Sequence, residues 1–167
     1  MLIIVEGEVT VSRPQQGSGG LIRTVRSGDY VGELSLLRGQ PRVADVTAGP
    51  EGVRGLILRG AELHAILEER PEAAMAMLAT LAERLGADSV WVPEYWAADA
   101  LTPLAYLAGQ TSTIRLATGI VQLGARTPAM LAMSALSLQG LSGVRFVLGI
   151  GSSGPQVMEG WHGVRFD

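Results

Sequence analysis

Residues 28–48 read GDYVGELSLLRGQPRVADVTA, and this stretch decides how the first part of the chain folds. Its residue pattern predicts a turn, one short helix, a loop and a strand, in that order. Glu33 falls in the first turn of the helix, and Arg42 falls at the start of the strand. Gly32 directly precedes the helix, so no side chain there blocks the approach of a ligand to the first backbone N–H groups.

The same residues have the chemistry of a sugar-phosphate site. The start of a helix attracts a phosphate, because its first N–H groups have no partner within the helix and lie at the positive end of its dipole. Here these groups belong to Leu34 and Ser35. Arg42 adds a planar, permanently charged group that can bind two phosphate oxygens at once. The carboxylate of Glu33 adds nothing to phosphate binding but can accept hydrogen bonds from sugar hydroxyls, so the pair points to a ribose phosphate.

A simpler interpretation of Glu33 and Arg42 is an exposed ion pair on an ordinary β-domain. Such surface pairs are common and contribute little to stability. The glycine before the helix, the helix start, the Pro41-Arg42 pair and the flanking strands all agree with a ligand site. We therefore favour the ligand site on the consistency of these features.

Two segments of the chain carry a family resemblance. Gly32-Glu33-Leu34-Ser35-Leu36-Leu37 and Pro41-Arg42-Val43-Ala44 resemble the phosphate-binding cassette of cyclic nucleotide-binding domains. The resemblance implies that Glu33 contacts the ribose 2′-hydroxyl and that Arg42 contacts the cyclic phosphate. It also implies that backbone groups of Gly32, Leu34 and Ser35 lie beside the phosphate.

Within that family, the residue after the arginine helps to select the purine, and a hydroxyl there favours guanine. Val43 has no hydroxyl, so cAMP is the expected ligand rather than cGMP. Val31, Ser35 and Asp45 depart from the family pattern. None of these departures removes a phosphate or ribose contact, although Asp45 places a negative charge near Arg42.

The rest of the first half predicts a small antiparallel sheet. Residues 2–5 and 9–11 read as β-structure bent at Gly7, and a loop at 14–20 joins them to a strand at 21–25, which makes a hairpin. A second hairpin is expected from strands at 43–47 and 53–58 around a Gly-Pro-Glu-Gly turn at 49–52.

Helices are expected after these strands. One covers residues 61–69, and another covers 71–85 with an apolar face of Ala74, Leu78, Leu81 and Leu85. The fold class expected for residues 1–85 is α+β, an antiparallel, jelly-roll-like β-roll with C-terminal helices. The resembled family has further strands before the position of Leu2, so this domain is expected to lack its first strands.

After Gly86 the pattern changes to strands that alternate with helices. Such alternation indicates βα units and a parallel sheet, an α/β arrangement. Ligands of these folds bind at the carboxyl ends of the strands. The expected strands are 89–92, 114–121 and 145–150, and the expected helices are 101–108 and 128–138.

Residues 82–167 resemble the luciferase-like monooxygenases, especially the branch that uses a deazaflavin coenzyme. The resemblance rests on LGADSVWV at 85–92, IRLATGI at 114–120, ARTPAM at 125–130, RFVLGIG at 145–151, GPQ at 154–156 and GWHG at 160–163. It implies a TIM-type (β/α)₈ barrel and an oxidoreductase that transfers hydride to or from a flavin-type ring, or uses reduced flavin with oxygen. The implied cofactor is the deazaflavin coenzyme F-420 or FMN.

The resemblance also implies cofactor-binding positions. Gly119 and Ile120 match a bulge that holds a non-prolyl cis peptide against the cofactor ring, and Glu94 and Ser152 match positions that contact the ring. The catalytic residues stay unknown, because Tyr95 stands where some relatives have a histidine. About three of the barrel strands are present, and three strands cannot close a barrel. We therefore expect this segment to be too incomplete for cofactor binding or activity alone.

Composition limits the other function classes. The chain has 167 residues, a net charge of −3 and no cysteine, so it lacks the basic surface of a nucleic-acid binder and has no disulfide or thiolate site. Two histidines offer too few ligands for a metal site. No apolar run reaches the roughly 20 residues of a membrane helix. The expected location is the cytoplasm.

Taken together, the sequence predicts two domains, 1–85 and 86–167. We expect a cAMP-binding sensor or regulatory module fused to part of a luciferase-like oxidoreductase, with association of copies through exposed sheet edges as an option. A cyclic-nucleotide-gated monooxygenase, active only with a complete barrel, is one alternative. The other is a non-functional truncated chimera, and a truncated or joined reading frame is the favoured origin of the fusion.

Overall fold

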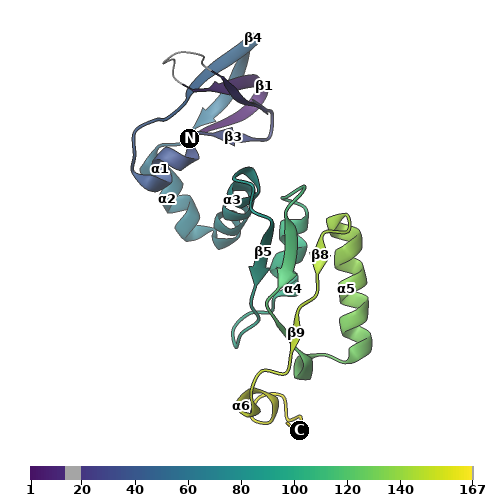
Figure 1. The fold of residues 1–167 in the computed structure, drawn as a ribbon. Helices are drawn as coiled ribbons and strands as arrows, with labels where there is room; N and C mark the ends of the chain where they lie inside the picture. Colours follow the sequence, from purple (N-terminus) through teal and green to yellow (C-terminus); the bar gives the residue numbers. More distant parts are fainter. Residues whose placement is uncertain (14–19, 167) are drawn as a thin grey trace. The chain divides into compact units, whose positions relative to one another are not determined.

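The computed structural model describes residues 1–13 and 20–166. These residues form two compact units, Met1–Arg70 and Pro71–Asp167 (Figure 1). Most of the loop expected at 14–20 lies outside the described residues. Among the described residues, no helix is long and apolar enough to cross a membrane.

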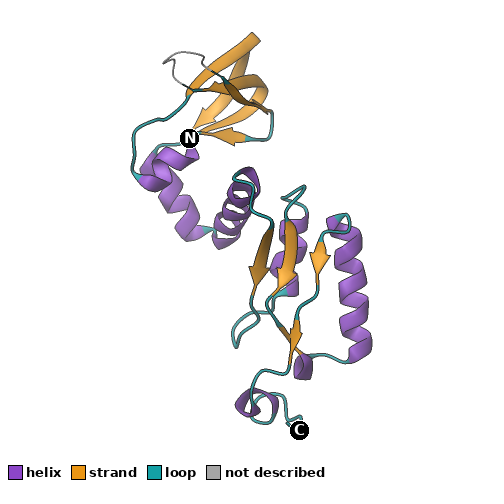
Figure 2. Cartoon of the chain, in the orientation of Figure 1, coloured by secondary structure: helices purple, strands orange, loops and turns teal. Residues whose placement is uncertain are grey.

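The first unit contains a four-stranded antiparallel sheet, as the sequence predicts (Figure 2). Strand β1 (Leu2–Ser12) lies at its centre. Along one edge of β1, its second half pairs with β2 (Leu21–Arg26) and its first residues pair with β3 (Tyr30–Val31). Along the other edge, β1 pairs with β4 (Asp45–Ile57) from Leu2 to Ser12. The buried core on this sheet consists of Ile4, Val9, Val11, Val25 and Val31.

The prediction of a second hairpin at 43–58 is wrong, because β4 runs through the Gly-Pro-Glu-Gly segment as one strand. Both halves of β4 pair with β1 in the same antiparallel sense, so the chain has no reason to reverse. Residues 49–52 instead bulge opposite Glu8, between the Gly7–Val53 and Val9–Ala48 pairs. Gly7 has φ 85, and a Cβ there would lie 2.4 Å from the carbonyl oxygen of Gly52. The expected bend at Gly7 is therefore a bulge where the two strands approach closely.

The helices of the first unit lie close to their expected positions. Helix α1 (Glu33–Arg38) ends at Gly39, whose φ of 61 is a common left-handed helix end. Helix α2 (Gly60–Glu69) begins with a capping box, in which the Arg59 N–H donates to the Glu62 carboxylate at 2.7 Å. Arg42 precedes β4 in a loop rather than starting the strand, because β1 ends at Ser12 and its last partner on β4 is Asp45.

The second unit has parallel strands with helices between them, as expected. Strands β5 (Ser89–Val92), β6 (Arg115–Thr118) and β8 (Phe146–Val147) form one parallel sheet. Strands β7 (Val121–Gln122) and β9 (Ile150–Gly151) form a separate parallel pair. The strands expected at 114–121 and 145–150 are thus each split in two. The helices are α3 (Pro71–Arg84), α4 (Leu101–Ala108), the 3₁₀ turn η1 (Leu123–Ala125), α5 (Pro128–Ser142) and α6 (Pro155–Met158).

Helix α3 belongs to the second compact unit. Its Ala79 lies in the same buried core as Leu104, Leu116 and Leu138. The compact units therefore divide before Pro71. The division into domains 1–85 and 86–167 stays a prediction about function.

The apolar face expected on α3 is only partly correct. Leu81 is buried, but Leu78 and Leu85 are 65% and 67% exposed. The buried residues of this helix are Met77, Ala79 and Leu81.

Arg145 ties the helices of the second unit to the sheet. Its guanidinium donates to the carbonyl oxygens of Ala108, Thr111, Ile114 and Ser142 and to the Thr111 hydroxyl, at 2.6 to 3.1 Å. Two of these carbonyls end α4 and α5, where a cation is favourable. The N-terminal ends of β6 and β8, which directly follow Ile114 and Arg145, are thereby held together.

Candidate functional site

The residues predicted for the nucleotide site come together in the first unit. Gly32, Glu33, Leu34, Ser35, Arg42 and Val43 all line one cavity of about 200 Å³. Strands β1, β3 and β4 contribute its apolar walls, which include Val11, Val31 and Val46. The cavity thus combines polar groups at one helix start with an apolar surface.

Gly32 and Arg42 determine the geometry of the helix start. Gly32 has φ 84, a conformation that favours glycine. A Cβ at this position would lie 2.0 Å from Arg42 Nη1. Arg42 Nη1 and Ser35 Oγ each donate to the carbonyl oxygen of Gly32, both at 3.1 Å. The absence of a side chain at residue 32 is therefore what allows the guanidinium to lie against the first turn.

Glu33 is buried, with 4% of its surface exposed. This burial excludes the simpler interpretation of an exposed ion pair with Arg42. The carboxylate lies in the first turn of α1, where the positive end of the helix dipole favours a negative charge. Val43, in contrast, is 72% exposed beside the same cavity.

Arg23 also lines this cavity, and the sequence analysis did not identify it. It lies on β2 and donates through Nη2 to the Tyr30 carbonyl oxygen at 3.1 Å and through Nη1 to Asp29 at 3.4 Å. The only available signal was a basic residue within the otherwise apolar start of the strand, LIRTV.

The cofactor-binding residues predicted in the second unit come together only in part. The Gly119–Ile120 peptide bond is cis, as the resemblance implied. The Glu94 N–H donates to the Ile120 carbonyl oxygen at 3.2 Å, so these two residues are in contact. Ser152 is exposed, and Gly119 lies against the Trp91 side chain.

The Glu94 carboxylate is occupied by protein groups. It accepts hydrogen bonds from Arg126 Nη1 at 2.9 Å, from the Gln122 N–H at 3.2 Å and from the Ala100 N–H at 3.4 Å. The Glu94 and Arg126 side chains are 6% and 16% exposed, so this ion pair is mostly buried. Burial alone would raise the pKa of Glu94, but the hydrogen bonds and the charge of Arg126 hold the pKa below its ordinary value. Glu94 is therefore a charged anchor between the loop after β5 and the segment after β6.

A flavin-type ring does not fit the four predicted positions as they stand. Glu94 lines a cavity of about 290 Å³ at the C-terminal ends of the strands. Gly119, Ile120 and Ser152 are not among the residues that line it. The carboxylate of Glu94 is engaged, and the other three residues do not enclose a ring together with it.

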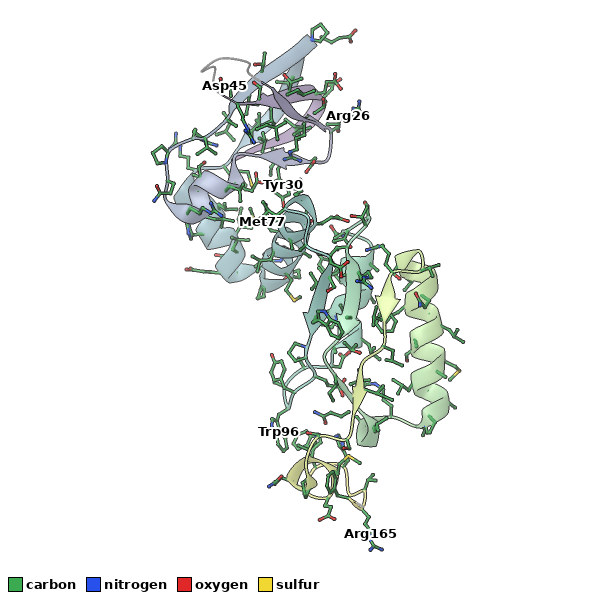
Figure 3. The ribbon with its side chains drawn as sticks, in the orientation of Figure 1. Arg26, Tyr30, Asp45, Met77, Trp96 and Arg165 are labelled. Carbon is green, nitrogen blue, oxygen red and sulfur yellow. The ribbon has the colours of Figure 1, made fainter. Side chains whose placement is uncertain are left out.

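The walls of this second cavity come from residues that the sequence analysis did not assign to a site. They include Tyr95, Trp96, Arg126, Trp161 and His162. Glu94, Tyr95 and the GWHG motif at 160–163 were noted for family resemblance, and the aromatic residues at and beside them were the available signal. Trp96 is labelled in Figure 3 on the loop after β5.

Comparison with known proteins agrees with two modules. The family profile described as luciferase-like monooxygenase matches residues 55–167, and that of the cyclic nucleotide-binding domain matches residues 1–70. A Mycobacterium tuberculosis protein named as a coenzyme F-420-dependent oxidoreductase is 50% identical over 97 residues. The match covers 58% of this chain and 28% of that protein, so the chain spans little more than a quarter of this relative.

Two further proteins are similar to one module each. The cAMP-dependent protein kinase regulatory subunit of Mycosarcoma maydis is 46% identical over 46 residues, covering 28% of this chain and 9% of the subunit. The oxygenating constituent of 3,6-diketocamphane monooxygenase, from a Pseudomonas putida plasmid and solved with FMN, matches with a TM-score of 0.51 and 28% identity. That match covers 56% of this chain and 28% of the monooxygenase.

Proposed function

Since the chain belongs to the luciferase-like monooxygenase family through residues 55–167 and carries a cyclic nucleotide-binding domain over residues 1–70, we propose that it is a cAMP-binding sensor fused to part of an oxidoreductase. The sensor comprises residues 1–85, a β-roll with C-terminal helices, and the partial barrel comprises residues 86–167. The observation that carries the proposal is the cavity at the start of α1, which gathers all the nucleotide-binding residues expected from the sequence.

The phosphate would bind between Arg42 and the start of α1. Arg42 uses Nη1 for the Gly32 carbonyl oxygen, and its Nε and Nη2 donors have no protein acceptor among the described residues. Those donors can bind two oxygens of a cyclic phosphate. Backbone groups of Gly32, Leu34 and Ser35 lie beside them in the same cavity.

The ribose and the base would occupy the rest of the cavity. Glu33 is the acid that lines it, and we assign it to the ribose 2′-hydroxyl. The apolar walls of Val11, Val31 and Val46 suit the face of a purine. Val43 offers no hydroxyl to a guanine, which favours cAMP over cGMP.

Isothermal titration calorimetry with cAMP and cGMP tests this function. We expect saturable heat with cAMP, weaker heat with cGMP, and loss of the cAMP signal in Arg42→Ala. Arg38→Ala is the matched control, because Arg38 is an exposed arginine at the end of α1 that does not line the cavity. A correctly folded protein that gives no heat with either nucleotide would contradict the proposal.

For residues 86–167 we propose a partial barrel that binds neither F-420 nor FMN without further walls. The engaged carboxylate of Glu94 and the separation of Ser152 from its cavity support this. Titration with FMN or F-420 should leave the absorbance spectrum of the cofactor unchanged. A saturable spectral shift would instead support the alternative function, a cyclic-nucleotide-gated oxidoreductase.

A further inference from the structure

Arg23 is a charged residue of the nucleotide cavity to which the proposed function gives no role. It lies on β2 opposite Val11 of β1, and Val11 in turn lies opposite Val46 of β4. Directly opposed residues of antiparallel strands share one face of the sheet, so these three side chains form a row across it. All three line the cavity. Since Val11 and Val46 are walls assigned to the purine, Arg23 lies at the end of the row that would hold the base.

Protein contacts hold the Arg23 side chain in this place. The side chain is 29% exposed, and it donates through Nη2 to the Tyr30 carbonyl oxygen at 3.1 Å and through Nη1 to the Asp29 carboxylate at 3.4 Å. The second carboxylate oxygen of Asp29 accepts the Tyr30 N–H at 2.8 Å. A guanidinium has five N–H donors. Within the described part of the chain, the Nε–H and the second N–H of each terminal nitrogen of Arg23 have no protein acceptor.

The two arginines that line the cavity differ in charge pairing. Arg23 forms an ion pair with Asp29 at 3.4 Å. Arg42 donates to the Gly32 carbonyl oxygen and has no acid partner among the residues that the structure describes. A phosphate gains more from a cation without an acid partner than from one that a carboxylate already neutralises. Arg42 is therefore suited to the phosphate, and Arg23 to the neutral edge of a base.

The free donors of Arg23 distinguish purines by the group at C6. The N7 edge of a 6-oxopurine presents two adjacent acceptors, N7 and O6, whereas adenine presents N7 beside an amino donor. A guanidinium has no acceptor for an amino group, but two of its neighbouring N–H groups can bind N7 and O6 together. The 2-amino group of guanine is a separate feature, for which Val43 offers no hydroxyl. The base that matches both residues is hypoxanthine, a 6-oxopurine without that amino group.

From these contacts we infer that Arg23 is a specificity-determining residue that binds N7 and O6 of the base, so that the cavity accepts cyclic nucleotides of 6-oxopurines as well as cAMP. The inference rests on the proposed function and adds a second ligand class to it. Cyclic IMP, the cyclic phosphate of inosine, carries hypoxanthine and should bind at least as tightly as cAMP. Cyclic GMP should bind more weakly than cyclic IMP, because its 2-amino group finds no partner at Val43.

Calorimetry of the full chain with cyclic IMP, cAMP and cGMP tests the inference. Arg23→Met keeps an unbranched side chain but removes the donors. A two-point contact to a base discriminates by about fivefold or more. The variant should therefore lower the affinity for cyclic IMP relative to cAMP by at least that factor, and the affinity for cGMP relative to cAMP should fall as well. A merely structural role, as a link to Tyr30, would weaken all three nucleotides equally.

Arg26→Met is the matched control. Arg26, labelled in Figure 3, lies on the same strand, forms an exposed ion pair with Glu8 and does not line the cavity. This variant should keep the affinity ratios of the wild type. Arg23→Lys retains the charge and a donor for the Tyr30 carbonyl oxygen, but its single nitrogen cannot reproduce the two-point contact. It should also lose the preference, and it serves as the test if the methionine variant does not fold.

Three results would overturn the inference and leave the proposed function standing, provided that Arg42→Ala still abolishes cAMP binding. One is weaker binding of cyclic IMP than of cAMP by the wild type. Another is an unchanged ratio of cyclic IMP to cAMP affinity in Arg23→Met. The third is a preference that Arg23→Lys retains, since charge alone would then account for it. A folded wild-type chain that gives no heat with any of the three nucleotides would instead contradict the proposed function itself.

Discussion

Arg42 Nη1 donates a hydrogen bond to the carbonyl oxygen of Gly32 at 3.1 Å, and the same nitrogen occupies the space that a Cβ on Gly32 would need. The arginine and the glycine thus form one structural unit, although α1 separates them in the sequence. Removing the free space at residue 32 must displace the guanidinium.

Gly32→Ala should therefore abolish the response to cAMP. The variant combines a strained backbone, at φ 84, with the displacement of Arg42. The strain alone costs about 1–2 kcal/mol of unfolding free energy. Gly28→Ala is the matched control, because Gly28 has φ 88 and no atom within 4 Å of its Cβ position. Both variants should melt earlier, and equal calorimetric affinities for cAMP in the two would argue against the role of Gly32.

Glu33→Gln should weaken recognition of the ribose. A hydrogen bond to a charged acceptor contributes about 1.5–3 kcal/mol, so the wild-type chain should prefer cAMP over 2′-deoxy-cAMP by about tenfold or more. The glutamine variant should lose most of this preference while it keeps its affinity for the deoxy nucleotide. Calorimetry with the two nucleotides measures the difference. A variant that discriminates as well as the wild type would show that Glu33 does not contact the 2′-hydroxyl.

Local features of the first site were accessible from the sequence, because Gly32, Glu33 and Arg42 lie within one short segment. Long-range pairing was not. The Gly-Pro-Glu-Gly segment at 49–52 has the composition of a turn. It stays extended because the residues before it and after it both pair with the same strand, β1. The function of Arg145 was hidden for the same reason, because the Ala108, Thr111 and Ile114 groups that it binds are 31 to 37 residues away.

The stability of the second unit should depend on pH through Glu83. Its Oε1 accepts hydrogen bonds from the N–H groups of Ser112, Thr113 and Ile114 and from the Thr113 hydroxyl. Burial would raise the pKa of Glu83, but these hydrogen bonds lower it below its ordinary value. A lowered folded pKa stabilises the fold above the unfolded pKa of about 4.3, and this stability is lost as the pH falls through the folded pKa.

Melting temperatures between pH 7 and pH 3 measure this effect. Glu83→Gln should lower the melting temperature at pH 7 and flatten its decline below about pH 4.3. Glu68→Gln removes the same charge from an exposed position on α2 and should leave the profile unchanged. If the Glu83 variant followed the wild-type profile throughout, its carboxylate would not stabilise the segment at 112–114.

Arg145→Met should destabilise the second unit more than the removal of any exposed charged side chain does. The variant leaves the carbonyl oxygens of Ala108, Thr111, Ile114 and Ser142 without their donor. Each buried group left unsatisfied costs about 1–3 kcal/mol, so we expect a loss of at least about 3 kcal/mol in urea unfolding. Arg115→Met is the control, because Arg115 forms an exposed ion pair with Asp88, whose removal costs about 0–1 kcal/mol. Since both variants exchange one arginine for one methionine, equal losses would mean that the hydrogen bonds of Arg145 add nothing beyond its charge.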